Sequence, residues 1–405
     1  MRTCFLRLWQ RARALLCRRD PVEYFIFLLS LGLFAFLIRM LIGGTEAFFA
    51  MFYKSCSELF MDFFHPLRDA ARGLGVYTEL GSIYPPLSNL IIYLLSLPVA
   101  GEYLHAPREM AGTWREYPGA LCCYLLFFLL CFALVYLILW RAGGARWRVL
   151  SALLLCSFPF LFLVERGNTM LLCLAAMLYF ALNYQSTSPV QRELALVALA
   201  FATAMKFYPV LLGAVLLGDR RWRDAWHAAL YGLALLFLPS LFYSGPVSVF
   251  WAIKNTLSFS QYSSGLSVEF MQQNAIPLQL GGTVLYCFYI FLILLAAFAA
   301  LAERKAWRAW MIAGCVMLTM PSIFSSYNWL LLLPALVVFH KTERLEGANW
   351  LYFFAMSAPF FLYPTRVLQD AVLVICLVAL YLCYLPQIYK NWRELIVNFR
   401  KQKKF

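Results

Sequence analysis

The sequence of 405 residues predicts an all-α, polytopic membrane protein. Hydrophobic residues make up 63% of it and charged residues only 13%, and the mean hydropathy is +0.72. Apolar runs recur along the chain, and several reach the roughly 20 residues that a membrane-spanning helix needs. A membrane β-barrel would alternate apolar and polar residues, which this chain does not do. We therefore expect one integral membrane domain, residues 1–405, with about 10–12 transmembrane helices.

The first apolar run, residues 22–42, follows a stretch rich in arginine, as the apolar region of a signal peptide would. It is too long for a cleaved signal and further apolar runs follow, so we predict a retained anchor. Residues 1–19 before it form either a cytoplasmic amphipathic arm on the inner membrane surface or a disordered arm, and the sequence leaves both open. The clearest later spans are residues 118–140, 283–302 and 366–386.

The distribution of charge predicts how these helices are oriented. If the N-terminus is cytoplasmic, 24 of the 34 Lys and Arg residues fall on one side of the membrane, which is the positive-inside pattern. The formal net charge of +14 then reflects topology and contact with anionic membrane lipids, so nucleic-acid binding is not expected. We predict a multi-pass protein of the plasma (inner) membrane with both termini cytoplasmic and residues 388–405 as a basic tail.

Two apolar segments are ambiguous, and the charge pattern decides both. If residues 84–99 crossed the membrane, the arginines within 141–148 would lie outside, so we predict that residues 43–117 form one large external loop. Residues 194–218 would invert the pattern in the same way if they formed a single span. Two half-helices that break at Lys206-Phe207-Tyr208-Pro209 would keep both ends inside, and proline after an apolar helix favours this break.

The predicted first external loop holds carboxylates beside apolar residues. Charged side chains are costly at a membrane edge, so these carboxylates indicate function. Asp62 lies within the aromatic run 60–64, with Glu58 before it and Asp69 after it. A carboxylate in this position suits a general base. Asp62 is therefore the predicted catalytic residue.

Cations are predicted at the same face of the membrane. Arg166 lies between two apolar runs, and Lys206 lies at the tip of the half-helix pair. Two cations that face a carboxylate would suit a phosphate leaving group and an activated hydroxyl. In the alternative interpretation, Arg166 and Lys206 snorkel to the membrane surface while Asp62 pairs with Arg68 or Arg72.

Cysteine and histidine give no sign of a metal site. Most of the twelve cysteines lie within predicted spans, where a small buried apolar side chain is the usual role. The four histidines are far apart in the sequence, and no Cys or His spacing is typical of zinc or of a redox pair. No metal and no cofactor is therefore predicted.

Five short motifs follow one another along the chain: Asp62-Phe63-Phe64, Tyr84-Pro85-Pro86-Leu87, Glu165-Arg166-Gly167-Asn168, Lys206-Phe207-Tyr208-Pro209, and Pro321 to Trp329 before a leucine run. Their order resembles that of glycosyltransferase family 87 over roughly residues 25–340. That family comprises membrane enzymes of GT-C fold, including mycobacterial polyprenyl-phosphate-mannose-dependent mannosyltransferases. The resemblance implies a GT-C-like fold whose large first external loop carries juxtamembrane helices and the catalytic carboxylate.

The resemblance also implies a reaction. A sugar, mannose or another hexose or pentose, would pass from a polyprenyl-phosphate donor to a lipid or glycan acceptor on the outer face of the cytoplasmic membrane. The transfer would invert the anomeric centre, with Asp62 as general base and with Arg166 and Lys206 near the lipid phosphate. The remaining candidate substrate-binding residues are Asp69, Tyr84, Glu165, Asn168, Tyr208 and Asn328.

Two other functions are weighed against this one. A polytopic transporter or flippase of a lipid-linked or small polar solute would also keep charges near the membrane, but transporters usually show matching helix breaks in two halves, and only one break is visible here. A polysaccharide polymerase or ligase would use a late external loop with several basic residues, whereas Lys254 is the one basic residue within 244–282.

Overall fold

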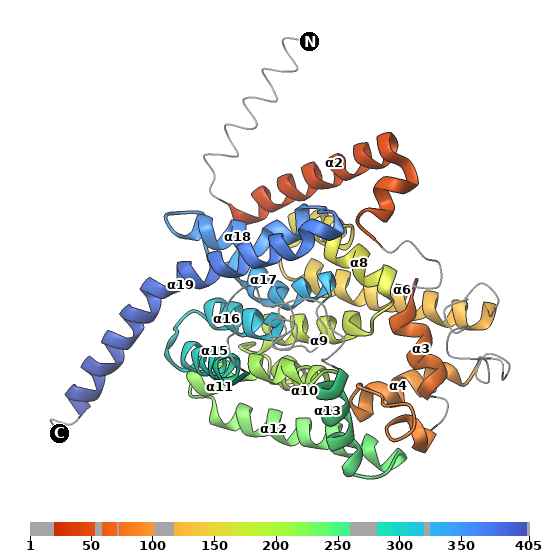
Figure 1. Ribbon diagram of the computed structural model, residues 1–405. Coiled ribbons are helices and arrows are strands. Elements are labelled where there is room, and N and C mark those ends of the chain that lie inside the picture. The colour runs from red at the N-terminus through yellow and green to blue at the C-terminus, as the bar shows by residue number, and fades with distance from the viewer. Residues whose placement is uncertain are drawn as a thin grey trace.

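The computed structural model describes residues 20–52, 59–70, 73–99, 101, 117–259, 282–319 and 325–402. These residues form a bundle of helices without a strand (Figure 1), which confirms the prediction of an all-α polytopic membrane protein. The predicted arm 1–19 and the end of the basic tail, 403–405, lie outside the described residues. So does much of the predicted external loop, including residues 102–116.

The longest apolar helices fit a membrane span. They are α2 (Pro21–Phe49), α6 (Pro118–Arg141), the stretch Trp222–Phe242 and the part Arg366–Glu394 of α19. Each has at least 18 residues and is apolar enough to cross the hydrocarbon core. The bent pair α7 (Gly144–Leu155) and α8 (Phe158–Arg166), with 49° between the two helices, would make a fifth span.

The whole of α19 runs from Arg366 to Gln402, and the stretch Trp222–Phe242 consists of α12 (Trp222–Phe237) and η6 (Pro239–Phe242). The remaining elements are α3 (Met61–Ala70), η2 (Gly73–Val76), α4 (Pro86–Ser96), α9 (Met170–Asn183), α10 (Pro189–Met205), η5 (Tyr208–Gly213), α11 (Ala214–Gly218), α13 (Val247–Phe259), α15 (Gly282–Ala302), α16 (Ala306–Thr319), η8 (Ser326–Leu332), α17 (Leu333–Thr342) and α18 (Asn349–Phe361). By length and composition, the described residues therefore hold four or five spanning helices, fewer than predicted. Helices occur in the predicted places, but 3₁₀ segments, prolines and polar turns divide several of them into lengths below one membrane thickness.

The first helix begins where its sequence predicts. Asp20 caps it, because the side-chain Oδ1 accepts a hydrogen bond of 2.9 Å from the Val22 amide. Pro21 occupies the first turn, where its missing N–H costs nothing. Leu31 and Phe34 on the outward side of α2 are exposed, as expected of side chains that face lipid.

Charged contacts join helix ends at one face of the bundle. Arg146 Nη1 at the start of α7 lies 2.7 Å from Asp20 Oδ2. Lys305 Nζ, between α15 and α16, lies 2.7 Å from Glu343 Oε1 after α17. We call the face that holds these four residues the basic face, since they belong to loops predicted to gather basic residues. Figure 1 shows α3 and α4 at the other end of the bundle from the α15–α16 connection.

The helix predicted to lie in the external loop is α4. Its 11 residues extend about 16 Å at 1.5 Å per residue, too short to cross a membrane. It packs against α3, α10 and η6. This agrees with the prediction that residues 84–99 do not cross.

The predicted break at Lys206 is present. α10 ends at Met205, and Lys206 itself is extended, with φ −147° and ψ 125°. The chain then returns to the basic face through η5 and α11, because Gln185 Nε2 before α10 lies 3.1 Å from Asp219 Oδ2 after α11. The segment therefore enters and leaves at one face, as two half-helices would.

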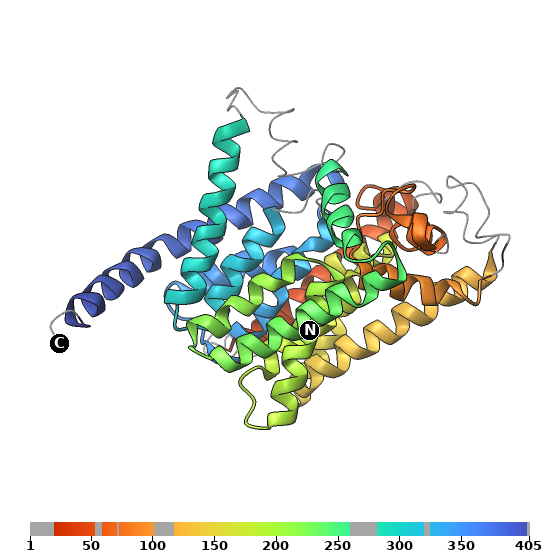
Figure 2. The same ribbon diagram turned by 90° about the horizontal axis from the view of Figure 1, so that it is seen from below.

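The centre of the bundle holds α9 and α16, whose residues are all buried or half-buried. In Figure 1, α9 lies between α6 and α10, and α16 lies between α17 and α15; Figure 2 shows the same bundle from below. The 3₁₀ segment η8 packs on both α16 and α8. This packing brings Tyr327 to the end of α8, where the candidate site lies.

Candidate functional site

Three side chains from distant parts of the sequence converge on the carboxylate of Asp62, in the first turn of α3. Arg166 Nη2 lies 2.6 Å from Asp62 Oδ1 and forms an ion pair. Asn168 Nδ2 donates to Asp62 Oδ2 at 2.9 Å. The Tyr327 hydroxyl donates to the same oxygen at 3.2 Å. The carboxylate is therefore held in one orientation by donors on both oxygens.

The backbone at Phe60 places Asp62 beside α8. Phe60 has a positive φ of 61°, which costs a bulky residue of order 1–3 kcal/mol unless its surroundings hold it. Its N–H donates to the Glu165 carbonyl at 2.8 Å. Its carbonyl accepts from the Phe63 and Phe64 amides at 2.9 and 3.0 Å, which starts α3. The Phe60 ring packs on Tyr124 with centroids 4.3 Å apart.

Gly167 allows this close approach. It caps α8 in the left-handed conformation, φ 73°, which favours glycine because it has no Cβ. A Cβ added there would lie 3.0 Å from both Phe60 Cα and Phe63 Cβ. The turn at Gly167 therefore fixes the directions in which Arg166 and Asn168 leave the backbone.

The amide of Asn168, in the turn between α8 and α9, is oriented by the first residue of α9. Its Oδ1 accepts from the Met170 amide at 2.9 Å, so its Nδ2 faces the site. That nitrogen donates both to Asp62 Oδ2 and to the Tyr327 hydroxyl, the latter at 2.8 Å. The Tyr327 hydroxyl thus accepts from Asn168 and donates to Asp62, which leaves each proton of this small network with one acceptor.

Tyr84 and Lys206 lie next to this network. The Tyr84 hydroxyl donates to the Asp62 main-chain carbonyl at 3.4 Å, and the Lys206 ammonium lies 4.5 Å from the centroid of the Tyr84 ring. Burial raises the pKa of Tyr84, and the Asp62 charge raises it further, so the phenol stays protonated. Lys206 also interacts electrostatically with Asp62. The Tyr208 hydroxyl contacts Met170 Sδ at 3.4 Å.

Hydrogen bonds from α4 and α13 hold the loop that carries Tyr84. The Tyr77 hydroxyl and Asn89 Nδ2 donate to the Tyr84 carbonyl at 3.0 and 3.3 Å. Asn255 Nδ2 on α13 donates to the carbonyls of Tyr77 and Ser82 at 3.1 and 3.0 Å. Asn255 was not singled out from the sequence, because a side chain that binds distant main-chain groups leaves no local pattern.

Most of the residues singled out from the sequence gather at this site. Those that do so through their side chains are Asp62, Tyr84, Arg166, Asn168, Lys206 and Tyr208. Glu165 is buried and contributes its main-chain carbonyl, which binds Phe60. Asn328 is buried beside Tyr327, and it is the Tyr327 hydroxyl that reaches Asp62.

Asp69 lies farther along α3. Its carboxylate pairs with Arg68 at 3.0 Å, and both residues are buried. Seven residues of helix place it about 10 Å beyond Asp62 along the axis. The alternative pairing of Asp62 with Arg68 is wrong, because the ion-pair partner of Asp62 is Arg166. Arg72 lies outside the described residues.

The set of side chains allows a limited range of chemistry. It contains one fixed carboxylate, one guanidinium, one ammonium and three phenols, together with a carboxamide. Among the residues that the structure describes, no group of three His, Cys, Asp or Glu could hold a metal ion. The arrangement suits proton removal by a carboxylate beside cations that stabilise an anionic leaving group.

Comparison with known protein families identifies the family of the chain. The family model of glycosyltransferase family 87 matches residues 83–326, which is more than half of the chain. The chain belongs to glycosyltransferase family 87. Neither a search of curated proteins nor one of solved structures gave a match.

The matched stretch of this family 87 glycosyltransferase contains Tyr84, Arg166, Asn168 and Lys206. Asp62 precedes it, and Tyr327 follows it directly. The contacts of Asp62 with Arg166 and Asn168 therefore connect the first loop to the family region. As a member of this family, the protein is a membrane glycosyltransferase that uses a sugar donor and an acceptor.

Proposed function

We propose that the protein transfers a hexose or pentose from a polyprenyl-phosphate donor to a hydroxyl of a lipid or glycan acceptor, at the outer face of the cytoplasmic membrane. The observation that carries the proposal is the ion pair of Asp62 with Arg166, 2.6 Å long, with Lys206 close by. A base and two cations in one cluster match the needs of a reaction that deprotonates a hydroxyl and releases a phosphate.

The proposed step is a single inverting displacement. Asp62 takes the proton of the acceptor hydroxyl, and the acceptor oxygen attacks the anomeric carbon of the donor sugar. The bond from that carbon to the phosphate oxygen breaks, and its electron pair leaves with the polyprenyl phosphate. Arg166 and Lys206 stabilise the negative charge on the departing phosphate.

In the resting protein Arg166 occupies Asp62 Oδ1. A donor phosphate competes for the same guanidinium, because it offers two oxygens to the planar fork of arginine. When Arg166 turns to the phosphate, Oδ1 becomes free to accept the proton. Asn168 and Tyr327 keep the carboxylate in place through Oδ2 meanwhile. Donor binding therefore precedes and prepares proton removal.

The test is transfer of labelled sugar from a synthetic polyprenyl-phosphate donor by the purified protein. Asp62→Asn removes the proton acceptor and should lower kcat by roughly 10²–10⁴-fold, the usual loss of general-base help. Its donor affinity, measured by binding of the unreacted donor, should remain.

Asp69→Asn is the matched control, since it changes a carboxylate of the same helix that pairs with Arg68. It should lower transfer far less than Asp62→Asn. Full activity of Asp62→Asn combined with loss in Asp69→Asn would move the base to Asp69. Uptake of a solute into vesicles, with no transfer from any polyprenyl-phosphate sugar, would support a transporter instead.

A further inference from the structure

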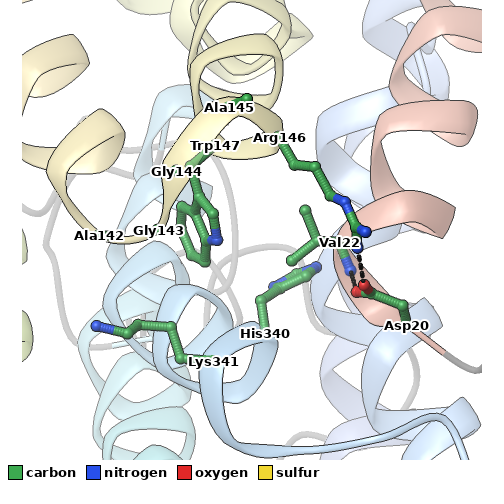
Figure 3. Close-up of a pocket in the computed structure, with 10 residues that line it drawn as sticks. All are labelled: Asp20, Val22, Ala142, Gly143, Gly144, Ala145, Arg146, Trp147, His340 and Lys341. Atoms are coloured by element: carbon green, nitrogen blue, oxygen red, sulfur yellow. Dashed lines mark hydrogen bonds and ion pairs between the residues drawn. The ribbon is translucent and has the colours of Figure 1, made fainter.

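A cavity lined by both polar and apolar residues lies at the basic face. It has a volume of about 540 Å³ and is lined by the start of α2, the turn between α6 and α7, and the end of α17 (Figure 3). Ligand pockets usually measure about 300–1,000 Å³. The 24 residues of α6, roughly 36 Å of helix, run from the side of α3 and α4 to this turn. The cavity is therefore separate from the Asp62 site.

A buried histidine, His340, is one of the residues that line the cavity. His340 is only 6% exposed, and its Nδ1 lies 2.5 Å from the Leu336 carbonyl. Since a carbonyl only accepts, Nδ1 carries the proton and the neutral ring presents a lone pair on Nε2. Nε2 is buried without a hydrogen-bond partner among the residues that the structure describes. Such an atom is costly unless a ligand supplies a donor.

The ring is also held in that orientation. It stacks on Phe25 with centroids 5.0 Å apart, and Phe353 contacts it at 5.8 Å. Figure 3 shows the imidazole pointing toward Val22 and Asp20. The acceptor is thus fixed beside the carboxylate of Asp20.

Asp20 and Trp147 supply the other walls. Each oxygen of Asp20 holds one donor, the Val22 amide on Oδ1 and Arg146 Nη1 on Oδ2, and each can accept a second. The indole of Trp147 lies across the cavity in Figure 3. An acceptor nitrogen, a carboxylate and an aromatic ring together are the usual partners of an ammonium group.

The neighbourhood of the cavity has the character of a membrane interface. Trp140, at the end of α6, is exposed, and the Arg148 guanidinium lies 5.7 Å from the centroid of its ring. Tryptophan and arginine of this kind are typical of helix ends at the headgroup level. Leu129 and Leu130 farther along α6 are exposed, as lipid-facing side chains are.

We propose that this cavity binds the headgroup of a phospholipid that carries a primary ammonium, of the phosphoethanolamine type. The ammonium donates to His340 Nε2 and Asp20 and lies against Trp147. Lys341, which also lines the cavity, balances the phosphate of the same headgroup. The acyl chains extend along the apolar outer surface of α6.

The test compares two lipids that differ only at nitrogen. Purified full-length protein in detergent is titrated with short-chain phosphatidylethanolamine or phosphatidylcholine, and bound lipid is counted by native mass spectrometry. Choline keeps the charge but has no N–H to donate. Wild-type protein should bind the ethanolamine lipid about ten-fold more tightly, as expected for one charged hydrogen bond.

Two variants should abolish that preference. His340→Phe keeps the stacking on Phe25 and removes the acceptor. Asp20→Asn keeps a good helix cap and removes the charge, so it decides the question if the histidine variant fails to fold. Glu193→Gln is the control, since Glu193 pairs with His227 at 2.9 Å and does not line this cavity. It should keep the full preference.

Three results would overturn the proposal. Wild-type protein could bind both lipids equally, or both cavity variants could retain the preference. Free phosphoethanolamine could also displace the lipid at equal concentration, which would make a soluble amine the occupant. None of these outcomes depends on sugar transfer, so the proposal stands or falls separately from the proposed enzyme activity.

Discussion

Replacement of Tyr327 by phenylalanine isolates one hydrogen bond of the Asp62 network. The ring of Tyr327 is buried, and phenylalanine preserves its volume while removing the hydroxyl. Asp62 Oδ2 then loses the 3.2 Å hydrogen bond from Tyr327 and keeps the 2.9 Å bond from Asn168. One proton of Asn168 Nδ2 still has Asp62 as acceptor, whereas the other loses the Tyr327 hydroxyl at 2.8 Å, so the variant should also lose some thermal stability.

The size of the effect follows from these contacts. A hydrogen bond to a charged group contributes about 1.5–3 kcal/mol, and the remaining Asn168 bond places the loss at the lower end. A loss of about 1.4 kcal/mol of transition-state stabilisation corresponds to a ten-fold fall in kcat. Because Tyr327 holds the base and does not bind the donor, the KM for the donor should stay unchanged.

The assay is steady-state transfer of labelled sugar, with kcat and both KM values measured. Tyr352→Phe is the matched control, since its buried hydroxyl donates to the Cys383 carbonyl at 2.7 Å between α18 and α19. That variant should lose thermal stability and keep kcat. Wild-type kcat in Tyr327→Phe, or an equal fall of kcat in both variants, would refute the positioning role of Tyr327.

Three further predictions concern the surroundings of Asp62. Gly167→Ala should lower both melting temperature and transfer, because a Cβ would lie 3.0 Å from Phe60 Cα at a left-handed position; a melting curve and a transfer rate like those of the wild type would contradict this. Lys206→Ala should raise the KM for the donor more than that for the acceptor, whereas Lys206→Arg should retain most donor affinity; unchanged donor kinetics in Lys206→Ala would remove it from the phosphate site. Cysteines at Gln185 and Asp219, whose side-chain ends are 3.1 Å apart, should be joined by a short bifunctional thiol reagent, detectable by gel mobility after cleavage of the connecting loop, and a failure to cross-link would contradict the return of this segment to the basic face.

The fold class and the break at Lys206 could be predicted because they depend on quantities carried by the sequence itself. Apolar runs fix helical membrane segments, and basic residues fix which loops share a face. A single span over residues 194–218 would have separated Gln185 from Asp219, which the structure places in contact. Helix lengths could not be predicted in this way, since a 3₁₀ segment such as η8 depends on packing against α8 and α16.

The site was partly predictable for a similar reason. Asp62, Arg166 and Lys206 stand out as charges in apolar surroundings. Because such charges are energetically costly, they indicate a functional site. Tyr327 carries no such signal, and its contact with Asp62 joins residues 265 positions apart. Asp69 carried the same signal as Asp62, but its pairing with the adjacent Arg68 depends on side-chain directions that the sequence does not determine.

The hairpin of half-helices that carries Lys206 bears on how the protein can evolve. Its two ends lie together at the basic face, so the hairpin adds no net crossing to the chain. Every loop after it therefore keeps its side of the membrane if the hairpin is lengthened, shortened or exchanged. The cation that it presents can vary between relatives without disturbing the signals that insert the rest of the protein.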